Sequence, residues 1–341
     1  MKRNCFVLLL VAALPGLCGA QPSAEDLARW AKELDHEDFA VREEASKKLV
    51  EAGLPAVAPL QQAALGKSLE ASSRAVRALR DQAKSANLEL KKAARAALEK
   101  LAASDHATAA PEARAAIRSF LVDIAARLEK NGAVITWEGD SLVAISFDNA
   151  TKIHEDLPLL KEMPDLKSLS MSNPQVDDKA IELLQGLSKL ESLNLYQSRI
   201  SDAGLPYLKK LPALRWLPMG ETLVTDKGLP HLAGLTKLEY LGLRANKVTD
   251  DGLIHLRKLT NLTGLYLGET QVTDKGLVHL RDMSKLNYLR LDTVDVTDKG
   301  LKELAVLKGL QRITLWDTKI TDEGVARLQK ALPGLEVQRT K

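Results

Sequence analysis

Three histidines recur at intervals of 24 residues, at His231, His255 and His279. Neutral imidazole is a common metal ligand, so a row of this kind could form a zinc site. Equivalent residues on successive packed helices, however, lie about 10 Å apart, whereas zinc binds each nitrogen ligand at about 2.0–2.1 Å. We therefore interpret the histidines as parts of a repeated structure and predict no metal site.

An aspartate recurs at the same interval and could suggest a row of calcium ligands. It always follows a hydroxyl residue, in the pairs Ser201-Asp202, Thr225-Asp226, Thr249-Asp250, Thr273-Asp274, Thr297-Asp298 and Thr321-Asp322. Short side-chain oxygens accept the unpaired amide protons at a helix start, and negative charge is favourable there. We interpret the pairs as helix starts, and no metal or other cofactor is predicted.

Residue combinations typical of an enzyme active site are missing from the sequence. The chain contains no G-x-G-x-x-G, P-loop, G-x-S-x-G or H-E-x-x-H motif. Its two cysteines, Cys5 and Cys18, both lie within the first 20 residues. The remaining chain therefore offers no thiol for catalysis, for a disulfide or for metal binding. We expect a protein that is not an enzyme.

These spacings belong to a repeat of 24 residues with the consensus LxxLxLxxTxVTDxGLxxLxxLxx. The alternating leucines of its first part predict a strand with one buried face, and the three-residue spacing of its second part predicts a short helix. Eight units are predicted, and they begin at Leu142, Leu166, Leu190, Leu214, Leu238, Leu262, Leu286 and Leu310. Such self-similarity predicts a solenoid.

The pattern resembles leucine-rich-repeat proteins, and its T-D-x-G-L signature is most similar to the F-box-associated subtype. That subtype favours Cys or Thr at the ninth position of the unit, which here holds Thr222, Thr270 and Thr318, with Asn246 in one unit. No F-box segment is recognisable. The resemblance implies an α/β solenoid, a leucine-rich-repeat horseshoe.

Unit positions 3, 5 and 7 should point to the concave face, because the leucines at positions 4 and 6 point inward. These positions carry a concentration of aromatic and arginine side chains, which are typical of binding hot spots. The alternative is cross-strand stacking that only stiffens the sheet. We predict a partner-binding surface made of Tyr196, Trp216, Tyr240, Arg244, Tyr266, Tyr288, Arg290, Arg312 and Trp316.

Residues 24–130 have helical spacing and few β-branched residues, which predicts an all-α module. The segment from Asp38 to Gly53 resembles the second helix of HEAT-like repeats. Arg74, Arg77 and Arg80 share one face of a helix. We interpret that face as a solvated surface, with an anionic polymer or acidic partner as the alternative. Residues 132–341 form the predicted solenoid, beginning with a hairpin that turns at residues 138–140.

Residues 1–20 resemble a secretory signal peptide, with Lys2 and Arg3 before an apolar run and small residues near Ala20. We therefore expect an exported protein of the periplasm, cell envelope or exterior, and the combination of modules resembles secreted bacterial repeat proteins. No other stretch has the length of an integral membrane span. A lipid anchor on Cys18 is disfavoured because Leu17 stands where a small residue is expected.

The charges are nearly balanced. The chain has 48 Lys and Arg against 45 Asp and Glu, and removal of Lys2 and Arg3 would leave 46 against 45, a net charge of +1. This balance gives no general attraction to nucleic acid. We predict a recognition or scaffold protein with a protein partner, or a glycan. The alternatives are a regulatory or substrate-binding subunit (for glycan or peptide) of an envelope enzyme and, third, a hydrolase.

Overall fold

The structure, a computed structural model, describes residues 21–339. The chain forms two compact units, one ending at Ser119 and the other beginning at Phe120. The predicted signal peptide, with Cys5 and Cys18, lies outside the described residues. Within residues 21–339, no helix is both long and apolar enough to cross a bilayer.

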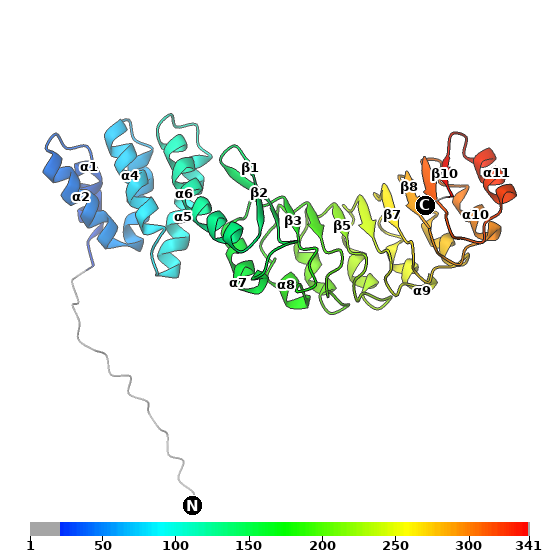
Figure 1. Ribbon diagram of the computed structural model, residues 1–341. Helices are drawn as coiled ribbons and strands as arrows, with labels where there is room; N and C mark the ends of the chain where they lie inside the picture. Colours follow the sequence, from blue (N-terminus) through cyan, green and yellow to red (C-terminus); the bar gives the residue numbers. More distant parts are fainter. Residues whose placement is uncertain (1–20, 340–341) are drawn as a thin grey trace, which may run out of the picture. The chain divides into compact units, whose positions relative to one another are not determined.

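The first unit is all-helical, as the sequence predicted for this region. Side chains of Ser23, Asp38, Ser68 and Asn87 accept backbone N–H groups at four helix starts, so the capping residues set these boundaries. The elements are α1 (Ala24–Glu33), α2 (Phe39–Ala52), η1 (Leu54–Ala56), α3 (Val57–Ala64), α4 (Leu69–Gln82), α5 (Leu88–Ala102) and the first half of α6 (Ala109–Lys130) (Figure 1).

Arg74 of α4 does not contribute to an open basic face. Its side chain is only 8% exposed and is paired with Glu43 of α2 and Glu70 of its own helix. Burial opposes the charge, but these two carboxylates raise the pKa of Arg74, so the guanidinium stays ionised. Arg77 is exposed and Arg80 half-buried. The basic face predicted from the sequence therefore loses its first member, because Arg74 links α4 to α2.

The second unit contains one 10-stranded sheet among the described residues. Strand β1 pairs with β2 in antiparallel fashion, which confirms the predicted hairpin, and all later neighbours are parallel. The strands are β1 (Val134–Glu138), β2 (Ser141–Ser146), β3 (Ser168–Ser170), β4 (Ser192–Asn194), β5 (Trp216–Pro218), β6 (Tyr240–Gly242), β7 (Gly264–Tyr266), β8 (Tyr288–Arg290), β9 (Arg312–Thr314) and β10 (Glu336–Gln338).

Strand β10 adds a ninth rung beyond the eight predicted units. It pairs in parallel with β9, and Val337 lies beside Ile313 at the same unit position. The sequence signal was short, because no helical segment follows this strand. Leu335, which is 4% exposed, closes the core beside it.

The second half of each unit returns on the opposite side of the core from the sheet (Figure 1). Several of these returns are 3-10 rather than α-helical, a form that is frequent in short connecting segments. The elements are α7 (Ile153–Asp156), η2 (Leu157–Glu162), α8 (Asp178–Glu182), η3 (Leu205–Lys210), η4 (Leu229–Leu232), α9 (Asp250–Leu253), η5 (Ile254–Leu256), η6 (Gly276–Leu280), α10 (Asp298–Leu304) and α11 (Asp322–Ala331).

The leucines of successive units form one continuous core. Leu217, Leu241, Leu265 and Leu289, at unit position 4, are all fully buried between strands and helices. The first rung of the core is covered by the second half of α6, in which Ala125 and Leu128 are buried and Leu121 and Ile124 pack against the cluster. Terminal rungs of a solenoid need such a cap because they lack a neighbour on one side.

The recurring aspartates connect neighbouring units. Asp226 Oδ1 accepts the backbone N–H of Thr249 at 2.8 Å, and its Oδ2 accepts the Thr249 hydroxyl at 2.6 Å. The same pair of hydrogen bonds joins Asp178 to Ser201, Asp202 to Thr225, Asp250 to Thr273, Asp274 to Thr297 and Asp298 to Thr321. The carboxylates therefore bond to the following unit. Asp250 and Asp298 also begin helices, as predicted, whereas Asp202, Asp226 and Asp274 lie two or three residues before their 3-10 turns.

In three of the pairs, the threonine is the residue that caps an α-helix. Thr249 Oγ1 accepts the N–H of Asp251 at 3.3 Å, and Thr297 and Thr321 cap α10 and α11 in the same way. The glycine of T-D-x-G has no side chain, and this leaves room for the aspartate carboxylate of the preceding unit. A Cβ on Gly252 would lie only 2.1 Å from Asp226 Oδ1.

Candidate functional site

The residues predicted to face the concave side line up across the sheet. Backbone register places Trp216 of β5 beside Tyr240 of β6, which lies beside Gly264 of β7. Tyr288 of β8 and Arg312 of β9 continue this row. Tyr266 and Arg290 lie side by side in the parallel row at unit position 5. Strands β5 to β8 thus carry the aromatic residues and β9 carries Arg312. These strands run from yellow-green to orange in Figure 1.

Four of these rings are in contact. The Trp216 and Tyr240 rings are stacked, with centroids 4.1 Å apart and an interplanar angle of 10°. Tyr240 meets Tyr266 edge to face at 4.9 Å, and Tyr266 meets Tyr288 at 5.2 Å. Both geometries are favourable for aromatic pairs. We call these four residues the aromatic row.

Exposure differs sharply along the aromatic row. Trp216 is 47% exposed, whereas Tyr240 is only 9% exposed. The Tyr240 ring lies over two glycines, since a Cβ on Gly264 would be 2.9 Å from its Cδ2 and one on Gly242 would be 3.2 Å from its hydroxyl. Tyr240 is therefore a packed residue of the row, which agrees with the stiffening alternative for this position, while Trp216 is open to solvent.

Two arginines extend the row. The Arg290 guanidinium lies 5.3 Å from the centroid of the Tyr266 ring, and the Arg312 guanidinium lies 5.9 Å from that of Tyr288. Arg290 also pairs at 2.9 Å with Asp292, whose side chain is fully buried. The ion pair holds Arg290 against the ring, a favourable cation–π arrangement. Trp316 lies two residues after the end of β9 and is half-buried.

Arg244 and Tyr196 belong to a charged network at one border of the aromatic row. Arg244 pairs with Glu221 and Glu269, each at 2.6 Å, and donates to the Tyr196 hydroxyl at 2.9 Å. Tyr196 in turn donates to Glu221. Neither glutamate is among the residues predicted from the sequence. A signal existed, because they follow unit position 7 in the units on either side of Arg244.

The network stabilises the ionised forms of Glu221 and Arg244. Hydrogen bonds from Tyr196 and Gln197 and the charge of Arg244 lower the pKa of Glu221. A hydrogen bond to Glu269 and the surrounding negative charge raise the pKa of Arg244. Its charge is matched by two carboxylates, so Arg244, which was predicted as part of the partner-binding surface, is already paired within the protein.

Burial raises the pKa values of three tyrosines on the concave face, so their phenols are weaker acids than that of a free tyrosine. Burial raises the pKa of Tyr266 to about 12, and it also raises the pKa values of Tyr240 and Tyr196. The fold therefore favours the neutral phenols. Their contribution to stability is complete below pH about 10, the unfolded pKa, and is lost as the pH rises through the folded values.

We expect the alkaline titration of tyrosinate absorbance to show this difference. In the native protein Tyr266 should ionise near pH 12, with Tyr196 and Tyr240 also delayed above the ordinary value. In urea all 5 tyrosines should ionise together near pH 10. A native curve that coincides with the urea curve would contradict the packing of these rings.

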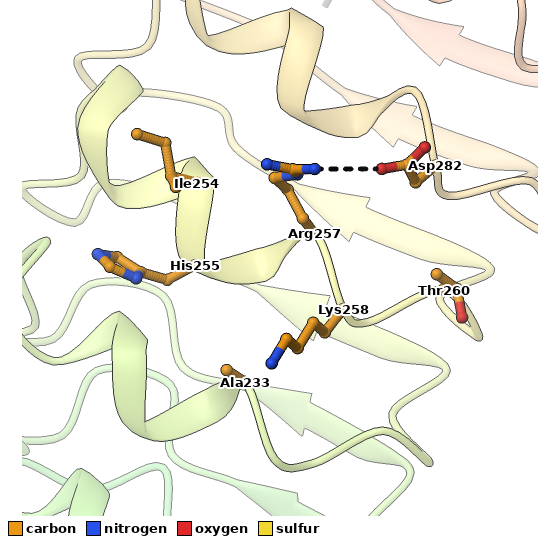
Figure 2. Close-up of a pocket in the computed structure, with 7 residues that line it drawn as sticks. All are labelled: Ala233, Ile254, His255, Arg257, Lys258, Thr260 and Asp282. Atoms are coloured by element: carbon orange, nitrogen blue, oxygen red, sulfur yellow. Dashed lines mark ion pairs between the residues drawn. The ribbon is translucent and has the colours of Figure 1, made fainter.

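The helix side of the second unit contains a surface hollow of about 580 Å³. It is lined by Ala233, Ile254, His255, Arg257, Lys258, Thr260 and Asp282. Figure 2 shows the Arg257 side chain directed toward Asp282, with an ion-pair distance of 3.9 Å. His255 is the only one of the three repeated histidines in this lining. In the described part of the chain, no group of three or more His, Cys, Asp or Glu side chains is arranged to hold a metal ion.

No protein-family model matches the chain, and no curated protein matches its sequence. Solved structures do resemble it. Internalin C2 from Listeria monocytogenes is 27% identical over 58% of this chain and 81% of its own, with a TM-score of 0.47. The LRR protein LIC12759 from Leptospira interrogans is 19% identical over 52% of this chain and 56% of its own, with a TM-score of 0.33.

The mouse RP105/MD-1 complex is a further structure of this kind. It is 21% identical over 52% of this chain and 31% of its own, with a TM-score of 0.42. These neighbours are leucine-rich-repeat proteins. The leucine-rich-repeat solenoid of the present chain is established by its own parallel strands and 24-residue register.

Proposed function

We propose that the protein is a non-enzymatic recognition or scaffold protein that binds a partner on the concave face of its solenoid. The observation that carries this proposal is the aromatic row with Arg290 and Arg312 laid against it. Aromatic and arginine side chains contribute most to binding when they are already held in place, because little rotamer entropy is then lost. A protein is the partner that this composition favours.

We further propose that the protein is exported after removal of residues 1–20, and that its helical unit is related to HEAT repeats. The residues of the HEAT-like signature support the second point, since Ala45 and Leu49 of α2 are buried and Gly53 ends that helix. The ninth unit position supports the likeness to the F-box-associated repeat. The hydroxyls of Thr270 and Thr318 donate there to the carbonyls of Leu267 and Leu315.

Export is tested by the mass of the protein isolated from its source. The charged start and apolar run predict cleavage near Ala20, so the mature chain should begin at or close to Gln21. Its recovery from an envelope or culture fraction would agree with that expectation. A cytoplasmic protein that retains Met1 would contradict it.

Concave recognition is tested by site-specific photo-crosslinking in the producing cells. Benzoylphenylalanine replaces Arg312, whose side chain is 58% exposed at the end of the aromatic row. In the matched control it replaces His231, which is exposed on the helix side. We expect a discrete adduct from the first position and none from the second. An adduct from His231 alone would place the binding surface on the helices.

A further inference from the structure

The Trp216 ring has one covered face and one open face. Its partner Tyr240 is one strand away, and the two rings are nearly parallel with centroids 4.1 Å apart. That distance is close to the strand spacing of about 4.8 Å. The stacking direction therefore runs across the strands, so the second face of the indole points toward β4. Trp216 is 47% exposed, and its neighbour on β4 is the small residue Ser192, which leaves this side uncovered.

Beyond Trp216 the concave face is made of small side chains. Ser192 of β4 lies directly beside Trp216, and Ser168 of β3 and Ala144 of β2 continue the same row. None of these side chains is large enough to cover an indole. Among the described residues, neither the Ser168 nor the Ser192 hydroxyl has a hydrogen-bond partner. Two free hydroxyl groups thus lie in line with the open aromatic face.

The adjacent row supplies polar groups in fixed positions. Asp148 Oδ1 accepts the Ser170 hydroxyl at 2.7 Å and the Ser172 N–H at 2.9 Å. Asn194 Nδ2 donates to Ser170 Oγ at 3.0 Å, and its Oδ1 accepts the N–H of Tyr196 at 3.0 Å. All of these side chains are partly exposed. The surface next to Trp216 is therefore polar, and its side chains are held in place by hydrogen bonds.

The chemistry of this corner differs from that of the aromatic row. An apolar protein side chain could pack against the Trp216 ring. It would also cover the neighbouring hydroxyl and amide groups without forming hydrogen bonds to them, which is unfavourable. A phosphate would need cationic groups. The units that begin at Leu142, Leu166, Leu190 and Leu214 carry no Lys or Arg at unit positions 3, 5 and 7. A pyranose ring satisfies both surfaces, because its C–H face is apolar and its edge carries hydroxyls.

We propose that strands β2 to β5 form a saccharide-binding subsite for a β-1,4-linked oligosaccharide, with Trp216 as the stacking residue. Sugars with equatorial substituents expose axial C–H bonds on a flat face, and the negative face of an aromatic ring attracts those hydrogens. Three strand spacings separate Ala144 from Trp216, about 14 Å, which is room for a short oligosaccharide. The subsite rests on the proposed recognition function and names one chemical class of ligand for it.

Calorimetric titration of the mature full chain tests the subsite with cellotetraose and chitotetraose as probes. Maltotetraose, an α-linked and curved chain, is the matched sugar control. We expect at least one β-linked probe to bind, about tenfold more tightly than maltotetraose. Trp216→Ala should weaken that binding by at least about tenfold. Trp30→Ala, a change of the same type in α1 of the helical unit, should leave it unchanged.

A second variant separates ligand binding from folding. Ser192→Tyr places a ring beside the open face of Trp216, in the register that Tyr240 occupies on the other side. We expect this ring to stack and to preserve the melting temperature, while it removes saccharide binding by occupying the site. Retained binding in Ser192→Tyr would show that the sugar does not use the indole face.

The subsite is overturned if neither β-linked probe binds, or if Trp216→Ala binds as tightly as the wild type. These results are distinguishable from failure of the proposed function. If the Arg312 photo-crosslink forms while neither β-linked probe binds, concave recognition stands and the saccharide subsite is wrong. If both β-linked binding and its Trp216 dependence are found without any Arg312 adduct, the sugar is the ligand and a protein partner on this face is rejected.

Discussion

Replacing Asp226 with alanine is expected to lower the free energy of unfolding by about 2–3 kcal/mol, because two hydrogen bonds to a carboxylate are lost at once. The Thr249 N–H and hydroxyl, which bond to Asp226 at 2.8 and 2.6 Å, would both lose their acceptor. The junction lies inside the solenoid, so its loss weakens the coupling between the units on either side. Urea unfolding followed by circular dichroism measures the effect.

Asp322 provides the matched control for this junction. It stands at the same unit position but is followed by no further T-D unit, and its side chain is 93% exposed and paired with Arg339. Asp322→Ala should change the free energy of unfolding by no more than about 0.5 kcal/mol, as surface substitutions usually do. Equal losses in the two variants would show that the aspartates act only on their own helices.

The second large effect is expected from Tyr240. Its ring is buried between Trp216 and Tyr266 and over Gly242 and Gly264, so Tyr240→Ala should cost about 3 kcal/mol in stability. Trp216→Ala removes a larger ring from the neighbouring strand, but that ring is 47% exposed. We expect it to cost less than about 1 kcal/mol. Urea midpoints of the two variants test the contrast directly.

Tyr240→Phe serves as the conservative variant, because it keeps the ring and removes only the hydroxyl. It should stay much closer to the wild type than Tyr240→Ala does. If Trp216→Ala destabilises the protein as strongly as Tyr240→Ala, the whole aromatic row is structural. The ligand would then have to be sought away from Trp216.

The fold could be predicted from sequence because its pattern is local and repeated. The leucine spacing fixes which side of each strand is buried, and the same spacing recurs often enough to define the register. The strand at Glu336–Gln338 escaped prediction because it stands alone without its helical half. The 3-10 form of η3 and η4 likewise depends on how tightly the chain returns to the core, which leucine spacing does not specify.

The sequence predicted on which face of the sheet the candidate-site residues lie, but not how deeply each side chain is buried. Alternation places Tyr240 and Trp216 on the same face, but the burial of Tyr240 depends on the space left by Gly242 on its own strand and Gly264 on the next. Glu221 and Glu269 were missed because they occupy left-handed backbone positions, with φ of 54° and 57°, outside the strand alternation. Arg74 was misread because its partner Glu43 comes from another helix.

The Asp-to-Thr junctions from Asp202 to Thr321 are alike, so the 24-residue units between them can be exchanged for one another. If residues 238–261 were deleted, Thr273 would take the place of Thr249 next to Asp226. Thr273 already makes the same two hydrogen bonds to Asp250. Gly276 would meet Asp226 as Gly252 does now. Duplication or loss of whole units therefore needs no redesign of the core. The chain can lengthen or shorten its recognition surface by one strand spacing, about 4.8 Å, at each such event.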